Sequence, residues 1–381
     1  MKKSLKTFFA AFLSVLAFSL VSCNDVIFAD IRNEVKLNDP TVSGSIQAIV
    51  RYGDNIYAAT GRIYYRPSSD DSSDKWEKLD NMPDTNAKIY NLAADEKYLY
   101  AVSLSFTDDD DGYNVGDERG LWRYDGSNWT RLLTIDYSST YFFIFCTNTP
   151  KEANRKAFFR YGSSVYELSA IDYDTEQTST ANWTALSTTT NTGTLSDGTN
   201  YSTFSYDGTE YSVAAAYSAT FLNNVGVILS PYRASTSNET ADDEATCVYT
   251  ADSDDIYYST YGSSWTAIDT DSDSIISMGF TQDFMLLGTA DGIQHVTMGA
   301  DKTDTNKPGS SIQDFDNNAA SALSSYNEVP ALLVVNPGAN EYSTAIFAAA
   351  EFSGSSSSTS ATLDNVGLWG YYPSEDEWNR E

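Results

Sequence analysis

The sequence predicts an all-β fold, a β-propeller of four-stranded blades, and three observations support this. Residues 46–80 and 89–133 share one order: an apolar strand, a turn, an aromatic-rich strand, and a third strand opened by glycine or arginine. A fourth strand with a tryptophan follows in both. Helix-forming residues at helical spacing are scarce, whereas polar turn residues are abundant. Four short strands repeated about every 50 residues are typical of a propeller, because one blade cannot bury both faces alone.

The third and fourth strands recur along the rest of the chain. The third-strand sequences are RIYYR, GLWRY, SVYELSA, DIYYSTYG, GIQHVTM and GLWGYYP. The fourth-strand tryptophans are Trp76, Trp129, Trp183, Trp265 and Trp378. The long interval after Trp183 fits either one unit with an inserted hairpin, turning at Asp207-Gly208, or two short units. The spacing therefore favours seven blades, with six as the alternative, in one domain over 45–381, and we expect the tryptophans to pack between blades.

The first residues predict an export signal. Lys2, Lys3 and Lys6 form a positive segment before an apolar run from Phe8 to Val21. This run is too short to span a bilayer as a helix, but it fits the hydrophobic part of a signal peptide. Residues 1–22 are therefore predicted to be a signal peptide that is cleaved from the mature chain.

The end of this segment, Leu20-Val21-Ser22-Cys23, resembles the lipobox of bacterial lipoproteins. The resemblance implies that Cys23 carries the lipid and that residues 23–44 tether the domain to the membrane. Two or three acyl chains anchor a protein stably, whereas one chain is marginal. We therefore expect an exported protein anchored to the bacterial envelope, at the periplasmic or the surface face of the outer membrane. The alternative is an ordinary signal peptide with a cysteine nearby.

The chain as a whole resembles spirochaete-type envelope lipoproteins. The motifs are the opening Asp30–Val50, the segment GRIYYR and the propeller-like repeats, which are Asp-box-like and kelch-like. Tyr257–Trp265 is similar to an Asp-box with Tyr261 at the aspartate position, and Tyr124–Trp129 keeps the aspartate and glycine. The Asp-box is a folding turn, so the resemblance implies location and architecture rather than chemistry.

The charge excludes one class of partner. The formal net charge is −30, which repels nucleic acid, and the sequence has no basic cluster with interleaved aromatic residues.

A single histidine, His295, rules out multi-histidine metal sites, and its strand-like setting GIQHVTM indicates a structural residue. The arginines are scattered, with no motif for a sialidase-type site. Cys146 and Cys247 either pair after export or remain as two buried thiols.

One acidic stretch, FTDDDDGYNVGDERG, has the spacing of a calcium loop. Thr107, Asp109 and Asp111 alternate before Gly112, and Glu118 follows at the distance of the last ligand. Thr107 stands where such loops usually begin with a carboxylate. Two interpretations remain: a Ca²⁺ site with ligands Asp109, Asp111 and Glu118, or a solvated loop between the second and third strands of its blade.

The predicted function is a lipid-anchored envelope lipoprotein whose propeller is a binding module. Its partner would be a protein or a glycan, contacted by loops at one end of the propeller. Catalytic residues, cofactors other than Ca²⁺ and binding of nucleic acid are not expected, and the protein is expected to be monomeric. The alternatives are a glycan-active, sialidase-like enzyme and a structural or assembly component of the envelope.

Overall fold

The computed structural model describes most of the predicted domain. The described residues are 41–81, 87–109, 112–136, 142–146, 157–162, 164–171, 175–186, 188–189, 201–206, 209–214, 247–252, 255–260, 265–269, 275–280, 284–290, 292–298, 308–314, 323, 327–336, 345–352, 366–375 and 377–381. Residues 41–381 form one compact unit. The predicted signal peptide (1–22) and Cys23 lie outside the described residues.

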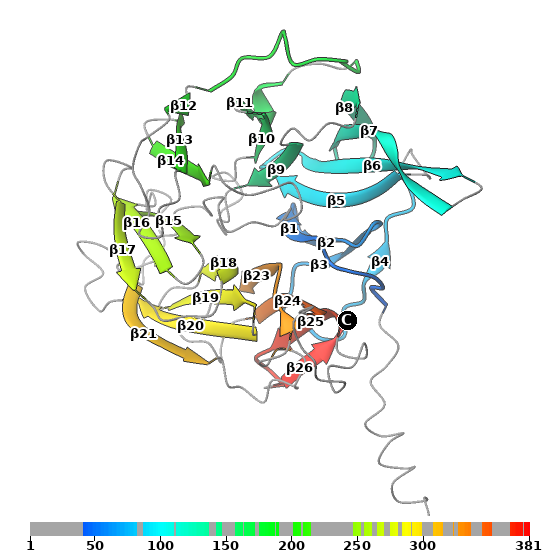
Figure 1. The fold of residues 1–381 in the computed structure, drawn as a ribbon. Helices are drawn as coiled ribbons and strands as arrows, with labels where there is room; N and C mark the ends of the chain where they lie inside the picture. Colours follow the sequence, from blue (N-terminus) through cyan, green and yellow to red (C-terminus); the bar gives the residue numbers. More distant parts are fainter. Residues whose placement is uncertain are drawn as a thin grey trace, which may run out of the picture. The chain divides into compact units, whose positions relative to one another are not determined.

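Antiparallel sheets follow one another along this unit (Figure 1). The first sheet contains β1 (Ala48–Tyr52), β2 (Asn55–Ala59), β3 (Ile63–Pro67) and β4 (Glu77–Lys78). The second contains β5 (Ala87–Ala94), β6 (Leu99–Asp109), β7 (Gly112–Tyr124) and β8 (Trp129–Asp136). The third contains β9 (Phe142–Cys146), β10 (Ala157–Tyr161) and β11 (Ser164–Glu167), followed by the short 3₁₀ helix η2 (Leu168–Ala170).

Four more sheets complete the described strands. The fourth sheet contains β12 (Thr188–Thr189), β13 (Tyr201–Tyr206) and β14 (Thr209–Ala214), and the fifth contains β15 (Cys247–Asp252), β16 (Asp255–Thr260) and β17 (Trp265–Asp269). The sixth contains β18 (Ile275–Phe280), β19 (Phe284–Thr289), β20 (Gly292–Met298) and β21 (Pro308–Asp314). The seventh contains β22 (Asn327–Glu328), β23 (Leu332–Asn336), β24 (Ala345–Phe352), β25 (Gly367–Tyr372) and β26 (Glu377–Arg380).

Five of these sheets pack face to face as propeller blades through four shared hydrophobic clusters. The clusters join the sixth sheet to the seventh, the seventh to the first, the first to the second, and the second to the third. The innermost strands β23, β1, β5 and β9 contact each other in this order. The last sheet of the chain is therefore packed on the first, as in a propeller.

The structure describes the packing of five blades, each with three to five strands. This corrects the prediction of seven or six blades. The fourth and fifth sheets are described by backbone alone, with β14 beside β15 and β17 beside β21. The prediction of four strands in every blade is also wrong for the described residues, in which the third sheet has three strands. Trp183, expected in its fourth strand, lies outside any strand. It packs against Phe159 and Tyr166 instead.

Small side chains explain how the blades approach each other near their inner strands. Strand β24 reads AIFAAAEF, and four of its residues are buried alanines, because a strand covered on both faces has room for little else. Gly288 in β19 is a stricter case. A Cβ there would lie 2.5 Å from the backbone oxygen of Val329 in the next sheet, so only glycine fits.

Several sequence-based elements are confirmed. The junction between β2 and β3 is short, and the IYYR part of GRIYYR lies in β3. The strands on either side of Asp207-Gly208 form a hairpin in which Tyr206 of β13 pairs with Thr209 of β14.

The compact unit begins at Thr41. Val42 falls within the predicted tether of residues 23–44, but it is fully buried between the first and seventh sheets.

Candidate functional site

A cluster of five aromatic rings, here called the aromatic arc, lies where the first and second sheets meet. It consists of Tyr52, Tyr57, Tyr65, Tyr124 and Trp129. The rings extend the hydrophobic cluster between these sheets towards the surface. Tyr57 and Tyr124 are buried, whereas Tyr52, Tyr65 and Trp129 are partly exposed. The arc is therefore both a packing element and a surface feature.

Strand register sets the order of the rings. Tyr57 of β2 lies opposite Tyr65 of β3, with centroids 5.9 Å apart. Tyr124 of β7 lies opposite Trp129 of β8, and these rings stack at 4.8 Å. Tyr52, at the end of β1, joins the two pairs, at 5.9 Å from Tyr57 and 6.4 Å from Tyr124. Such distances are favourable for aromatic contacts, so the arc is continuous across two blades.

The polar ends of the rings are satisfied within the protein. The hydroxyl of Tyr52 donates to the carbonyl of Lys97 at 2.9 Å, and the hydroxyl of Tyr124 donates to the carbonyl of Gly126 at 2.8 Å. Trp129 Nε1 donates to Asn81 Oδ1 at 3.3 Å, and Asn81 Nδ2 donates to the carbonyl of Ser127. These bonds hold the rings in place and leave mainly their apolar surfaces for a partner.

Exposed carboxylates, here called the carboxylate rim, surround the arc. They are Glu77, Asp80 and Asp125. Tyr65 donates to Glu77 Oε2 at 2.8 Å. This bond, with smaller contributions from burial and from the charges of Glu77 and Asp80, raises the pKa of Tyr65. The charged side chains acting on this ring are therefore negative.

The pKa of Tyr52, at the centre of the arc, is raised as well. Burial raises the pKa of Tyr52 to about 12, and the neighbouring tyrosines and the carboxylates Asp125 and Asp95 add to the shift. Tyr52 at the centre of the arc and Tyr65 at one end thus lie near negative charges, which favour a positively charged group near the rings.

Asp125 also builds the turn that carries Trp129. Its Oδ1 accepts the backbone N–H groups of Ser127 and Asn128 at 2.8 and 2.7 Å, and these bonds lower the pKa of Asp125. Gly126 has a φ of +94°, which favours glycine. The Asp-box-like segment predicted here is therefore a structural turn between β7 and β8.

Two of the three predicted calcium ligands, Asp109 and Glu118, lie on the β6–β7 hairpin within the described residues. Asp109 pairs with Gly112 at the end of the β6–β7 hairpin, and Asp111 lies outside the described residues. Ser105 donates to the carbonyl of Glu118 at 3.2 Å, so Glu118 is level with a residue four positions before Asp109, about 13 Å away along a strand.

Glu118 contacts a cation of its own sheet. Its Oε2 accepts from Arg131 Nη2 at 3.4 Å. Among the described residues, no group of three or more metal-binding side chains is present. The expected loop is instead a long β-hairpin formed by the ends of β6 and β7, and the Ca²⁺ site stays a prediction.

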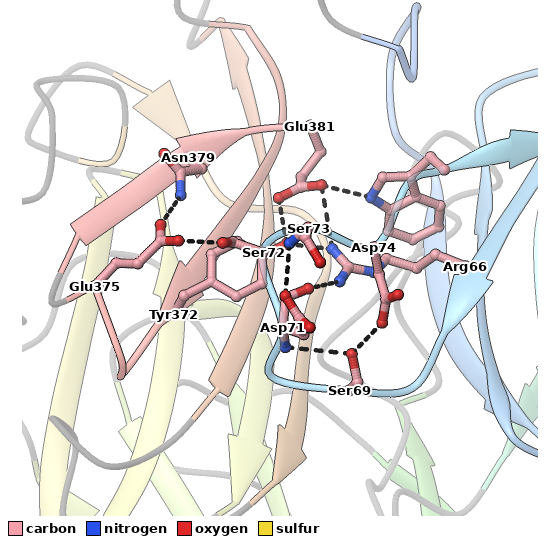
Figure 2. A network of polar contacts seen from close by, with 11 residues as sticks. Arg66, Ser69, Asp71, Ser72, Ser73, Asp74, Tyr372, Glu375, Asn379 and Glu381 are labelled. Atoms are coloured by element: carbon pink, nitrogen blue, oxygen red, sulfur yellow. Dashed lines mark hydrogen bonds and ion pairs between the residues drawn. The ribbon is translucent and has the colours of Figure 1, made fainter.

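A second polar cluster lies between the first and seventh sheets, and Figure 2 shows Arg66 of β3 pointing at Tyr372 of β25 and at Glu381. Arg66 is fully buried and donates to the Tyr372 hydroxyl and to Glu381 Oε2, the latter at 3.3 Å. Trp76 Nε1 donates to the same Glu381 oxygen at 2.8 Å, and the hydroxyl of Tyr372 donates to Glu381 Oε1 at 2.5 Å. We call these four residues, with Phe347, the closing cluster.

The electrostatics of the closing cluster are those of a buried ion pair. Burial raises the pKa of Glu381, and the charge of Arg66 opposes this shift without cancelling it. The Arg66 guanidinium also lies 5.0 Å from the Phe347 ring centroid. The hydrogen bonds of these side chains connect β3 to β25 and to Glu381, so the cluster joins the two sheets.

The same pair of sheets contains two facing carboxylates. Glu351 of β24 lies opposite Glu328 of β22, and Ser45 and Gln47, just before β1, donate to Glu351 Oε1. Burial, and then the charge of Glu328, raises the pKa of Glu351 to about 7. Its protonation therefore changes near neutral pH at a contact between the two ends of the folded unit.

His295 and the buried arginines have structural positions. His295 is 7 % exposed in β20, between Leu286 of β19 and Gln313 of β21, as its sequence predicts. Arg123 Nη1 donates to the carbonyl of Ile171, and Arg160 Nε donates to the carbonyl of Gly162. These two arginines therefore bind carbonyl groups of the protein, and they belong to different sheets.

The two remaining cysteines lie in separate strands. Cys146 ends β9 opposite Ala157 and is half-buried, and Cys247 begins β15 opposite Thr260.

Sequence-based interpretation missed the aromatic arc and the closing cluster. The only signal for the arc was the tyrosine content of the first two repeats, and pairing of the rings depends on which blades are neighbours.

The first comparison concerns the N-terminal quarter of the chain. Residues 6–107 match the model of the TP013X lipoprotein family. A lipoprotein of Treponema pallidum (strain Nichols) is 29% identical over 100 residues, which are 25% of this chain and 20% of that protein. A second lipoprotein of the same strain is 31% identical over 75 residues, 20% of this chain and 19% of that protein. These matches agree with the predicted resemblance to spirochaete lipoproteins, and the chain matches about a fifth of each relative.

Solved structures with related architecture are distant. Kluyveromyces lactis Hsv2 aligns with a TM-score of 0.40 and 10% identity, covering 88% of this chain and 97% of that one. The extracellular domain of the putative one component system BT4673 from B. thetaiotaomicron aligns with a TM-score of 0.39 and 12% identity, covering 84% of this chain and 40% of that one. The WD40 β-propeller domain of Doa1 aligns with a TM-score of 0.36 and 7% identity, over 83% and 92%. The propeller assignment rests on the sheet topology.

Within the described part of the chain, no helix has the length and apolar character needed to cross a bilayer.

Proposed function

We propose that this protein is a lipid-anchored lipoprotein of the bacterial envelope and that its propeller binds a protein or glycan partner. The observation that carries the binding role is the aromatic arc, whose partly exposed rings lie beside exposed carboxylates at a junction of two blades. Partly exposed aromatic residues are typical of binding surfaces, because they supply large contact areas with few rotatable bonds.

The anchoring part of this proposal concerns Cys23. The lipobox-like Leu20–Cys23 and the match to a lipoprotein family over residues 6–107 support lipidation at this cysteine. The mature chain would begin at Cys23 and remain monomeric at the periplasmic or surface face of the outer membrane.

A non-catalytic role fits the described residues better than glycoside hydrolysis. Arg66, Arg123 and Arg160 bind groups of their own surroundings, so they do not converge on a substrate carboxylate. A pair of carboxylates by itself indicates little in a chain with 53 acidic residues.

The anchoring proposal is tested by labelling with a radioactive fatty acid in a bacterial host that lipidates exported proteins. The wild-type chain should take up the label and sediment with membranes, whereas Cys23→Ser should do neither. Cys146→Ser is the matched control and should behave as wild type. Equal labelling of Cys23→Ser and wild type would rule out the assigned lipid site.

The binding proposal is tested by crosslinking full-length protein to envelope extract and comparing wild type with Trp129→Ala. A partner captured by the wild type and lost with the arc variant supports the role. If Trp129→Ala captures the partner as well as the wild type does, the binding role does not depend on the aromatic arc.

A further inference from the structure

We propose that the aromatic arc binds positively charged side chains, arginine or lysine, on a basic segment of a partner protein. The inference rests on the proposed binding role and names the class of partner. It depends on the geometry of the rings, the sign of the surrounding charge and the hydrogen bonds already formed within the protein.

The geometry offers aromatic surface to a cation. Tyr52, Tyr65 and Trp129 are the partly exposed members, and buried Tyr57 and Tyr124 connect them. A guanidinium or ammonium within about 6 Å of a ring centroid is attracted by the ring quadrupole. Because consecutive centroids lie 4.8 to 6.4 Å apart, a cation at the arc can contact more than one ring.

The protein already contains cations over aromatic rings next to the arc. The Arg123 guanidinium lies 4.7 Å from the ring centroid of Tyr98, and that of Arg131 lies 5.1 Å from Trp122. Both pairs belong to the second sheet. The arc presents further tyrosine and tryptophan rings near the surface, and in its case the carboxylate rim provides the negative charges.

The charge at the site is complementary to a cation. Asp125 and Asp95 act on Tyr52, and Glu77 and Asp80 act on Tyr65. The two N–H bonds to Asp125 keep its pKa low, so this carboxylate stays ionised near neutral pH. The formal net charge of −30 adds long-range attraction for a basic partner.

The internal hydrogen bonds argue against a neutral glycan at the same place. Recognition of a sugar needs polar groups that can bind its hydroxyls. The hydroxyls of Tyr52, Tyr65 and Tyr124 all donate to the protein. Both polar atoms of the Asn81 amide, and Nε1 of Trp129, are also bonded within the protein. What these groups leave at the arc is ring surface, negative charge and mainly hydrogen-bond acceptors, which suit a cation that donates.

The test uses full-length protein in detergent and calorimetric titration with an N-acetylated arginine–glycine peptide. A glutamine–glycine peptide of equal length is the neutral probe. We expect the arginine peptide to bind and the glutamine peptide to be silent. Trp129→Ala and Tyr65→Ala should each weaken binding about fivefold or more. Tyr64→Ala is the matched control, because Tyr64 is a half-buried aromatic residue on the other face of β3, and it should leave affinity unchanged.

Two further variants protect the test against loss of folding. Asp125→Asn keeps the side-chain oxygen that accepts the turn hydrogen bonds but removes the charge, and Trp129→Phe keeps a ring. Both should weaken binding about threefold while a cooperative melting transition shows that the variants remain folded.

Each other result is informative. Equal affinity of wild type and all arc variants for the arginine peptide would mean general attraction to an acidic protein and would overturn the inference. Arc-dependent binding of a neutral oligosaccharide, with no binding of the peptide, would overturn the choice of partner while leaving the binding role. If the wild type does not bind the arginine peptide but Trp129→Ala loses the captured partner, the choice of a basic partner is likewise overturned and the binding role of the arc is kept.

Discussion

The first sheet has two neighbours, and its contacts with them differ in chemistry. Towards the second sheet it presents alanine, valine and aromatic residues, ending in the aromatic arc. Towards the seventh sheet it places Arg66 and Trp76 against Tyr372 and Glu381, so a buried ion pair lies within an apolar cluster. The first and second sheets follow each other in the chain, whereas the first and seventh are joined only through the fold.

The difference shows what each contact requires. Consecutive sheets are held near each other by the chain, so apolar packing is sufficient, and polar edges are left for other uses. The sheets at the two ends of the unit must find one defined alignment. A buried ion pair supplies little net stability but penalises every arrangement in which either charge is left unpaired. We expect substitutions in the closing cluster to cost more stability than substitutions in the arc.

The largest effect is expected for Arg66→Met. This change leaves Glu381 buried without its cation, which should lower the free energy of unfolding by about 3–5 kcal/mol. Denaturant unfolding measures it. Arg131→Met is the control, since Arg131 pairs with exposed Glu118 and Glu176, and should cost about 1 kcal/mol or less. The double variant Arg66→Met/Glu381→Gln should recover part of the loss. Equal losses for both single variants would remove the distinction between the two contacts.

A matched pair of tyrosine substitutions gives a smaller effect. Tyr372→Phe deletes the hydroxyl that donates to Glu381 and accepts from Arg66, and should cost about 1–3 kcal/mol. Tyr65→Phe deletes one bond to exposed Glu77 and should cost about 0.5 kcal/mol or less. Thermal unfolding of the two proteins in one buffer compares them directly. A larger loss for Tyr65→Phe would contradict the comparison.

The smallest effect is a pH dependence from Glu351. Its pKa is raised from 4.5 to about 7 in the folded protein, so between these values the folded state holds a proton that the unfolded state has released. Stability therefore falls as pH rises from 4.5 to 7.

Glu351→Gln should remove this fall and stabilise the protein at pH 8 by about 1 kcal/mol relative to wild type. This magnitude is reduced for partial exposure to water. At pH 5 the variant and wild type should match. Unfolding curves at both pH values test this, with Glu375→Gln on the exposed surface as the control. A variant that follows the wild-type pH profile would assign the dependence to other carboxyl groups.

Local patterns in the sequence predicted the local structure. The IYYR part of GRIYYR lies in β3 and GLWRY ends β7, because alternating aromatic and polar residues suit strands covered on one face more than the other. Asp125 and Gly126 form the expected turn, since the aspartate oxygen and the freedom of glycine act within four residues. The acidic segment after Phe106 was less predictable, because strands β6 and β7 extend through much of it.

Contacts between distant segments could not be predicted from these patterns. Arg66 and Tyr372 belong to repeats of similar appearance, and nothing in RIYYR distinguishes an arginine that will be buried against another sheet. Their meeting depends on the seventh sheet packing on the first. The same reason hides the aromatic arc, because Tyr52 and Tyr124 come from different blades.

The closing cluster also determines when the first sheet can be completed during folding. Arg66 and Tyr372 are 306 residues apart in sequence, and the backbone N–H of Val42 bonds to the carbonyl of Glu381. Contacts of such high sequence separation form late and slow the folding reaction. While the chain emerges from its N-terminus, β1 to β4 lack their second neighbour. The first sheet therefore gains its second neighbour only after β25 has been synthesised.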